Sequence, residues 1–84
     1  MDEKVLVNVM LPATGKTYDF WVPTSTTIHD ATIFIANILS QREHSMFQTT
    51  GESALALRDT GMILDHNTTF ADHNIINGFE LLLV

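Results

Sequence analysis

The sequence predicts an α+β fold in which one helix packs across a mixed sheet of four to five strands. Two alternating apolar segments joined by a short turn open the chain, a long segment of helical periodicity follows, and an apolar strand comes last. The 84 residues fit a single domain, 1–84. A domain of this size needs nearly every strong apolar segment for its core.

The first two strands are expected to form a hairpin. Segments 5–11 and 17–22 each place apolar residues at every second position, as strands with one buried face do. Between them, the Pro-Ala-Thr-Gly stretch at 12–15 has the composition of a turn. Pro23 ends the second strand, because proline has no N–H to donate to a neighbouring strand.

A helix is expected from about Thr27 to Glu43. Thr27 and Asp30 have the spacing of a capping box, and an apolar segment follows them. At ~100° per residue, the face toward the sheet consists of Ile28, Ala31, Thr32, Ile35, Ile38 and Leu39. Ile33 falls well outside this arc and Phe34 lies at its margin.

The second half of the chain is expected to complete the sheet. Gly51 lies in the next loop, and short strands are predicted at 54–58 and 62–64. A compact connection with one helical turn at 68–75 leads to the last strand, 79–84. A strand this apolar belongs at the centre of a sheet, because at an edge it would template aggregation. Its expected neighbour is the first strand, in a parallel pair.

Charge and hydropathy exclude several classes of partner. Ten acidic residues against four basic ones give a net charge of −6, which repels nucleic acid and anionic lipid. No run approaches the ~18 apolar residues of a membrane span, and the start MDEKVLVNV does not resemble a signal peptide. A cytoplasmic protein without direct membrane insertion is expected. The absence of cysteine excludes thiol chemistry.

No motif in the sequence indicates an enzyme, a cofactor or a metal site. The i, i+4 spacing of a helical metal pair is lacking in the histidines, which are His29, His44, His66 and His73. The Thr-Gly-Lys-Thr stretch at 14–17 lacks the upstream glycine of a phosphate loop, and a strand follows it. Ser53, Asp65 and His66 have no nucleophile elbow around them.

The order of elements and several short motifs resemble the β-grasp, or ubiquitin-like, fold. GKTYDFWVP at 15–23 is similar to the second strand of ubiquitin and its exit turn. TIHDATIFI at 27–35 is similar to the start of its helix, and LDHNTTFADHNI at 64–75 to the stretch between its fourth and fifth strands. These segments cover most of the chain, so the resemblance implies the same fold throughout.

A closer resemblance is to the YukD-like family, small bacterial ubiquitin-like proteins that accompany type VII secretion systems. The family's second strand is matched by TYDFWVP at 17–23, and its ending by IINGFELLL at 75–83, with Phe79 in place of the usual Asp. The resemblance implies a non-catalytic cytosolic accessory or regulatory component of the secretion machinery. Such a component is expected to dock onto a larger protein, such as a membrane subunit or the ATPase.

The end of the sequence bears on the alternative function, that of a ubiquitin-class modifier or sulfur carrier. Such proteins need a flexible tail ending in Gly-Gly, whereas this sequence ends on NGFELLLV. Conjugation is therefore not expected. Arg58 stands where ubiquitin's receptor-binding patch has its central isoleucine, so recognition by ordinary ubiquitin receptors is not expected either.

Apolar side chains that the core does not need form the candidate protein-binding surface. Trp21 alternates away from the core-facing positions of its strand, so it is expected on the sheet face opposite the helix, together with Leu6 and Met10. These large side chains on adjacent strands predict one contiguous patch, and tryptophan is enriched at binding hot spots. Ile33 and Phe34 mark a second candidate surface on the helix. Homodimerisation through the sheet face is the alternative to binding another protein.

Overall fold

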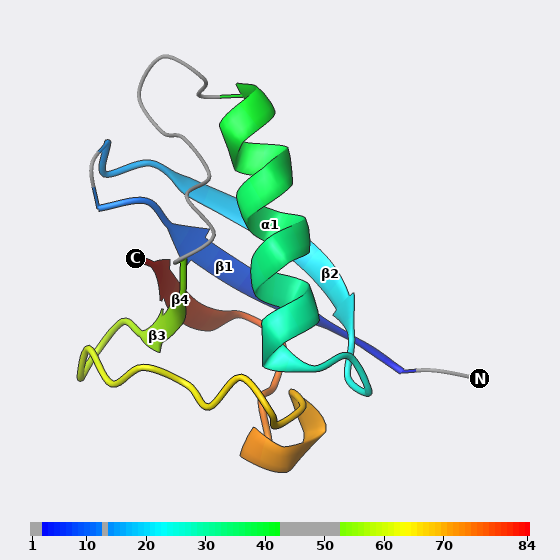
Figure 1. Cartoon of the computed structure of the whole chain (residues 1–84). Coiled ribbons are helices and arrows are strands. Elements are labelled where there is room, and N and C mark those ends of the chain that lie inside the picture. The colour runs from blue at the N-terminus through cyan, green and yellow to red at the C-terminus, as the bar shows by residue number, and fades with distance from the viewer. Residues whose placement is uncertain (1–2, 13, 43–52) are drawn as a thin grey trace.

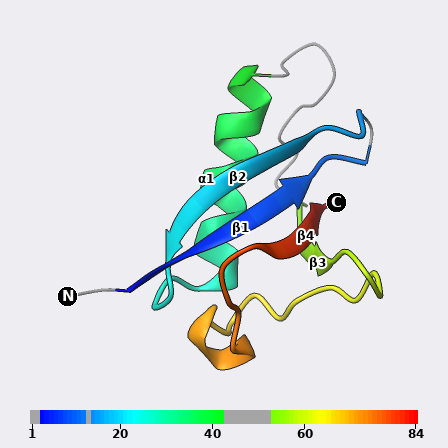
Figure 2. The same cartoon turned by 180° about the vertical axis from the view of Figure 1, so that it is seen from behind.

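One helix crosses one face of a four-stranded sheet whose strand order is β2-β1-β4-β3 (Figure 1). The computed structural model describes residues 3–12, 14–42 and 53–84. Turned by 180°, the sheet lies in front of the helix and shows its uncovered face (Figure 2). The elements in chain order are β1 (Lys4–Met10), β2 (Thr17–Pro23), α1 (Ile28–Arg42), β3 (Leu55–Leu57), the 3₁₀ turn η1 (Ala71–His73) and β4 (Phe79–Leu83).

The strand pairing confirms the predicted sheet. β1 and β2 form an antiparallel hairpin in which Leu6 lies opposite Trp21. β1 and β4 are parallel and central, with Val9 opposite Leu81, as their apolar sequences indicated. β3 pairs antiparallel with β4. Both central strands carry apolar residues on each of their two faces.

The helix packs in the expected orientation. Ile28, Ala31, Thr32, Ile35 and Leu39 are all buried, whereas Ile38 is only half-buried. Ala36 is buried although its helical angle had not placed it in the core face. The hydroxyl of Thr32 donates to the Ile28 carbonyl oxygen at 2.7 Å, which satisfies a polar group inside an apolar core. Ile33 points outward, with 47% of its surface exposed.

Two predictions about the second half are corrected or left open. Segment 62–64 is not a strand; it contributes an isolated bridge between Ile63 and Ala56. Its residues follow a tight turn at Gly61, which leaves little length for a regular ladder. The predicted helix end at Glu43, together with His44 and Gly51, lies outside the described residues.

The 66–75 connection fastens the start of the helix. The backbone N–H groups of Ile28 and His29 donate to the carbonyl oxygens of Thr68 and His66, at 2.8 and 3.1 Å. The N–H of Asp30 donates to the Thr27 hydroxyl oxygen at 3.2 Å, so the predicted N-cap forms. The first turn of the helix therefore has a fixed place beside the end of β2.

Candidate protein-binding surface

Trp21 is the most prominent apolar side chain on the uncovered face of the sheet. It is 59% exposed and lies opposite the half-buried Leu6 of β1. The register makes this a pair without mutual backbone hydrogen bonds, in which facing side chains lie closest. The structure thus brings together two of the three residues predicted on this face.

A row of polar side chains crosses the same face. The Asn8 amide donates to the Asp19 carboxylate at 2.8 Å, and the Arg58 guanidinium donates to the Asn8 side-chain oxygen at 2.6 Å. Arg58 also forms an ion pair with Glu80 at 2.9 Å. These four residues, one from each of β2, β1 and β4 and one just after β3, are called the polar row below. The row runs across the whole sheet.

Met10 lies on the other side of the polar row from Leu6 and Trp21. It pairs with Thr17 on β2 and with Leu82 on β4. Asn8 stands between Leu6 and Met10 on the same face of β1, because side chains on one face recur at every second residue. The prediction of one contiguous patch through Leu6, Trp21 and Met10 is therefore wrong, and the candidate surface is confined to the Trp21 end of the face.

A groove runs between β2 and the helix at that end. It has a volume of about 420 Å³, within the range of ligand-binding clefts. It is lined by Lys4, Trp21, Val22, Pro23, Thr26, Asp30, Ala31 and Phe34. Phe34 is 55% exposed, so the groove has an exposed aromatic side chain from each of its two walls. We call it the β2 groove.

Trp21 and Phe34 were predicted on separate surfaces, yet they line the same groove. This follows from the position of β2 at the edge of the sheet, where the margin of the helix lies next to the strand. Ile33 is exposed but does not line the groove. The sequence predicted an outward Trp21 and placed Phe34 at the margin of the helix's core face. It carried no signal for their proximity, which depends on how the helix crosses the sheet.

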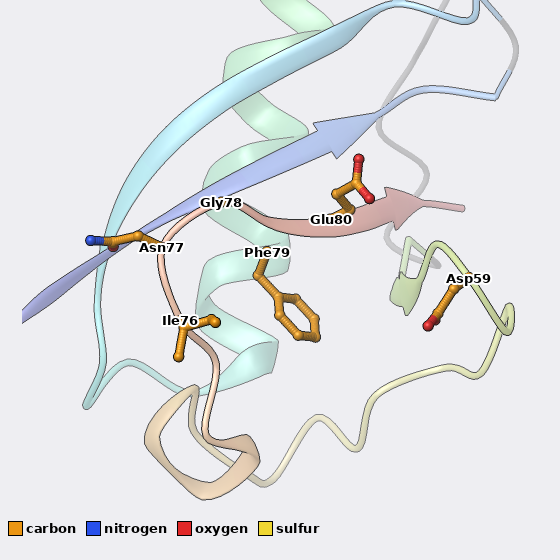
Figure 3. A pocket seen from close by; sticks show the side chains of 6 residues that line it. All are labelled: Asp59, Ile76, Asn77, Gly78, Phe79 and Glu80. Atoms are coloured by element: carbon orange, nitrogen blue, oxygen red, sulfur yellow. The ribbon is translucent and has the colours of Figure 1, made fainter.

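A second, smaller pocket lies beside the start of β4 (Figure 3). Its volume is about 260 Å³, and it is lined by Asp59, Ile76, Asn77, Gly78, Phe79 and Glu80. The ring of Phe79 points into the space between Ile76 and Asp59. The Asn77 side-chain oxygen accepts from the Leu6 backbone N–H at 2.9 Å, so this wall is tied to β1. The sequence had marked only Phe79, as a departure from a family motif.

The sequence motifs considered above for phosphate or metal binding are next located in the structure. Gly15 has a φ of 72° in the hairpin turn, where its N–H donates to the Leu11 carbonyl oxygen at 2.8 Å. The rings of His29 and His66 have centroids 5.6 Å apart. In the described part of the chain, no three or more His, Asp or Glu side chains are grouped to hold a metal ion, and no helix is long and apolar enough to cross a membrane.

Solved structures share this architecture, although no family model and no curated protein matches the chain. The ubiquitin-like domain of EccD5 from Mycobacterium xenopi superposes with a TM-score of 0.82 at 16% identity, over 98% of this chain and 93% of that one. The ubiquitin-like domain of the Mycobacterium tuberculosis type VII secretion protein ECCD1 gives 0.79 at 16% identity, over 98% of each chain.

A chain of the MycP5-free ESX-5 inner membrane complex is also similar. It gives a TM-score of 0.81 at 20% identity over 96% of this chain. The match spans only 20% of that longer chain. At such identities the likeness concerns the fold, and it confirms the predicted ubiquitin-like β-grasp architecture.

Proposed function

We propose that this chain is a non-catalytic protein-interaction module that serves as a cytoplasmic accessory or regulatory component of a type VII secretion system. Its fold is that of the ubiquitin-like domains named in such systems, and its strand motifs resemble those of the YukD-like family. The observation that carries the proposal is the exposure of Trp21, at 59%, beside an apolar groove. The partner is a larger protein of the machinery, a membrane subunit or the ATPase.

Physical chemistry favours this surface as a docking site. Burying a tryptophan removes a large apolar area from water while ordering few rotatable bonds. Trp21 has Leu6 beside it on one side and the groove with Phe34 on the other, so a partner that covers it also covers their apolar surface. The polar row bounds the surface and supplies hydrogen-bonding groups at its rim, as at other interfaces.

Truncating Trp21 tests the proposal. The Trp21→Ala variant should lose about 2 kcal/mol or more of binding free energy, some 30-fold in affinity, for partners co-purified from the source cell. Its melting temperature should change little, because the side chain lies outside the core. Ile33→Ala is the matched control, since Ile33 is exposed but lies outside the groove. A folded Trp21→Ala protein that keeps every partner at wild-type affinity would refute docking through this surface.

Met10→Lys defines how far the surface extends. Met10 lies across the polar row from Trp21, so the added charge should weaken binding much less than the loss of Trp21. A loss as large as that of Trp21→Ala would show that the interface continues over the row.

The alternative function is that of a ubiquitin-class modifier or sulfur carrier, which has the same fold. The intact mass of the protein in cell extract distinguishes the two functions. Covalent adducts to other proteins or a terminal thiocarboxylate would support the modifier or carrier, whereas an unmodified mass supports the interaction module.

A further inference from the structure

On the outer edge of β2, backbone groups have no hydrogen-bond partner among the described residues. The N–H of Thr24 donates to the Glu3 carbonyl oxygen at 2.8 Å, and the N–H of Leu11 donates to the Lys16 carbonyl oxygen at 3.0 Å. These two pairs set the alternation of the antiparallel ladder between the two strands. Within β2, residues 18, 20 and 22 therefore bond to β1, whereas residues 17, 19 and 21 direct their N–H and C=O groups away from the sheet.

Nothing in the described part of the chain covers this edge. β2 is the terminal strand of the sheet, and no strand among residues 3–12, 14–42 and 53–84 pairs with its outer side. The edge is seven residues long, enough for several backbone hydrogen bonds to an added strand. Edge strands of this kind are the sites at which proteins accept extended peptides.

The β2 groove lies beside the same edge. Side chains of a strand added to β2 would point alternately toward the helix side and toward the uncovered face of the sheet. On the helix side, the position beside Val22 opens into the groove against Ala31 and Phe34. On the uncovered face, the neighbouring position lies against Trp21. Backbone pairing and both apolar contacts are thus available to one extended segment.

We propose that β2 accepts an extended peptide segment of a partner protein as an additional strand, with an apolar side chain in the β2 groove and a basic side chain opposite Asp19. This inference rests on the proposed function and specifies the chemistry of the partner. The backbone bonds supply sequence-independent affinity, and the groove and Asp19 supply selectivity.

Asp19 is the reason for a basic side chain. It is the only charged residue of β2, and the group that donates to its carboxylate, the Asn8 side-chain amide at 2.8 Å, is neutral. Among the described residues no cation forms an ion pair with it. The charges of Lys4 and Asp30, which both line the groove, offset each other, so Asp19 leaves a negative charge at the edge. The net charge of the chain, −6, is also negative. A lysine or arginine of the partner complements it.

The same charge argues against a second copy of the chain as the occupant. The β2 sequence, TYDFWVP, contains no basic residue. Two β2 strands paired edge to edge would therefore bring no cation opposite Asp19. The register centred on Asp19 would place two carboxylates against each other, which is destabilising. A different protein segment satisfies the edge better than self-association does.

The test uses two libraries of short synthetic peptides in which apolar residues alternate with variable ones. The first library carries one Lys or Arg at the position opposite Asp19, and the second carries Glu at that position. The folded protein should select binders from the basic library only. On binding, the backbone amides of Asp19 and Trp21 should become protected from hydrogen exchange, while the amides that face β1 stay as they were.

Two substitutions separate the charge from the backbone bond. Asp19→Asn should lower the affinity for the selected basic peptide by up to about fivefold, which is the size of effect expected for an exposed ion pair. Asp19→Pro also removes the outward N–H and should lower the peptide affinity by up to about a further tenfold. Proline is tolerated where an edge N–H faces solvent. If Asp19→Pro does not fold, a peptide methylated on the facing backbone nitrogens makes the same comparison on the unaltered protein.

Three results would overturn strand addition: selection of no peptide, equal selection of the acidic library, or full affinity of the methylated peptide. In each case the proposed function can be judged separately, because cellular partners that need Trp21 would still bind through its side chain. A dimer that protects the same amides in the absence of peptide would instead assign the edge to a second copy and overturn the peptide as its occupant.

Discussion

The two outer edges of the sheet differ in how their outward backbone groups are paired. On the β3 side, the outward N–H of Leu57 donates to the Met62 carbonyl oxygen, and Leu55 accepts from the N–H of Leu64, both at 2.9 Å. On the β2 side, the outward groups of Asp19 and Trp21 have no such cover among the described residues. In the part of the chain that the structure describes, one edge is thus protected by a following segment, and the other lies uncovered next to an apolar groove.

Local chain geometry produces this difference. After β3, Gly61 adopts a φ of 75°, and its N–H donates to the Leu57 carbonyl oxygen at 2.8 Å. This turn returns the chain along β3, where Leu64 inserts into the core with 3% of its surface exposed. After β2, Pro23 ends the strand and the chain turns into the helix instead. The covered edge is therefore tied to the core, whereas no described segment returns along the β2 edge.

Removing the buried anchor of the covered edge should have the largest effect. Leu64→Ala should cost about 2 to 5 kcal/mol of unfolding free energy, because it leaves a cavity in the core. Ile63→Ala is the control: its side chain is 60% exposed, and its loss should cost less than about 1 kcal/mol. Urea melts of both variants measure the difference. Similar losses at the two positions would mean that the 62–64 segment does not seal the edge as described.

Hydrogen exchange should distinguish the two edges without any substitution. The amide of Leu57 is hydrogen-bonded to Met62, whereas the amides of Asp19 and Trp21 face outward. Protected amides exchange only when the structure opens, so Leu57 should exchange more slowly by on the order of a hundredfold after correction for intrinsic rates. The amides of Tyr18 and Phe20 serve as the internal reference, since they face β1. Strong protection of Asp19 in the free protein would contradict an open edge.

Arg58 links the covered edge to the polar row. Its Nη2 atom donates to the backbone oxygens of Asn8 and Leu81 at 2.9 and 3.1 Å. Arg58→Met should cost about 1 to 3 kcal/mol in urea melts, because these part-buried acceptors lose their donor. The value should fall toward the lower end, since the buried Nε of Arg58 has no hydrogen-bond partner that would be lost. Arg58→Lys should recover only part of the loss, because an ammonium cannot reproduce the guanidinium fork. An Arg58→Met protein with the unfolding free energy of the wild type would show that the polar row does not contribute to stability.

Substitution of Asp72 should have the smallest effect on stability, and only at acidic pH. The backbone and hydroxyl of Thr69 hold the pKa of Asp72 below its ordinary value of 3.8, and the Thr69 N–H donates to its carboxylate at 2.9 Å. A lowered pKa in the folded state stabilises the protein above the ordinary value, and this stabilisation is lost as pH falls through the folded value. Asp72→Asn should therefore flatten the decline of stability with pH below about 4. If the stability of the variant declined below pH ~4 as steeply as that of the wild type, this role of Asp72 would be contradicted.

The sequence contained enough to predict most of the fold and only part of the site. Alternation in β1 and β2 predicted which side chains face away from the helix, and helical spacing separated Ile33 from Ile35 correctly. These predictions succeed because periodicity is a local property of the chain. The covering of β3 by residues 62–64 was predicted only as a short strand, since the pairing depends on the turn at Gly61 and on burial of Leu64.

What the sequence by itself determined is the identity of most elements and the orientation of most of their side chains, including the outward direction of Trp21 and Ile33. The tertiary structure alone decided which of these side chains become neighbours. It joined Trp21 to Phe34 because β2 is the edge strand beside the helix, and it separated Met10 from Trp21 because Arg58 extends a polar row across the sheet. Such neighbours come from positions far apart in the chain, and local periodicity holds no information about the distance between them.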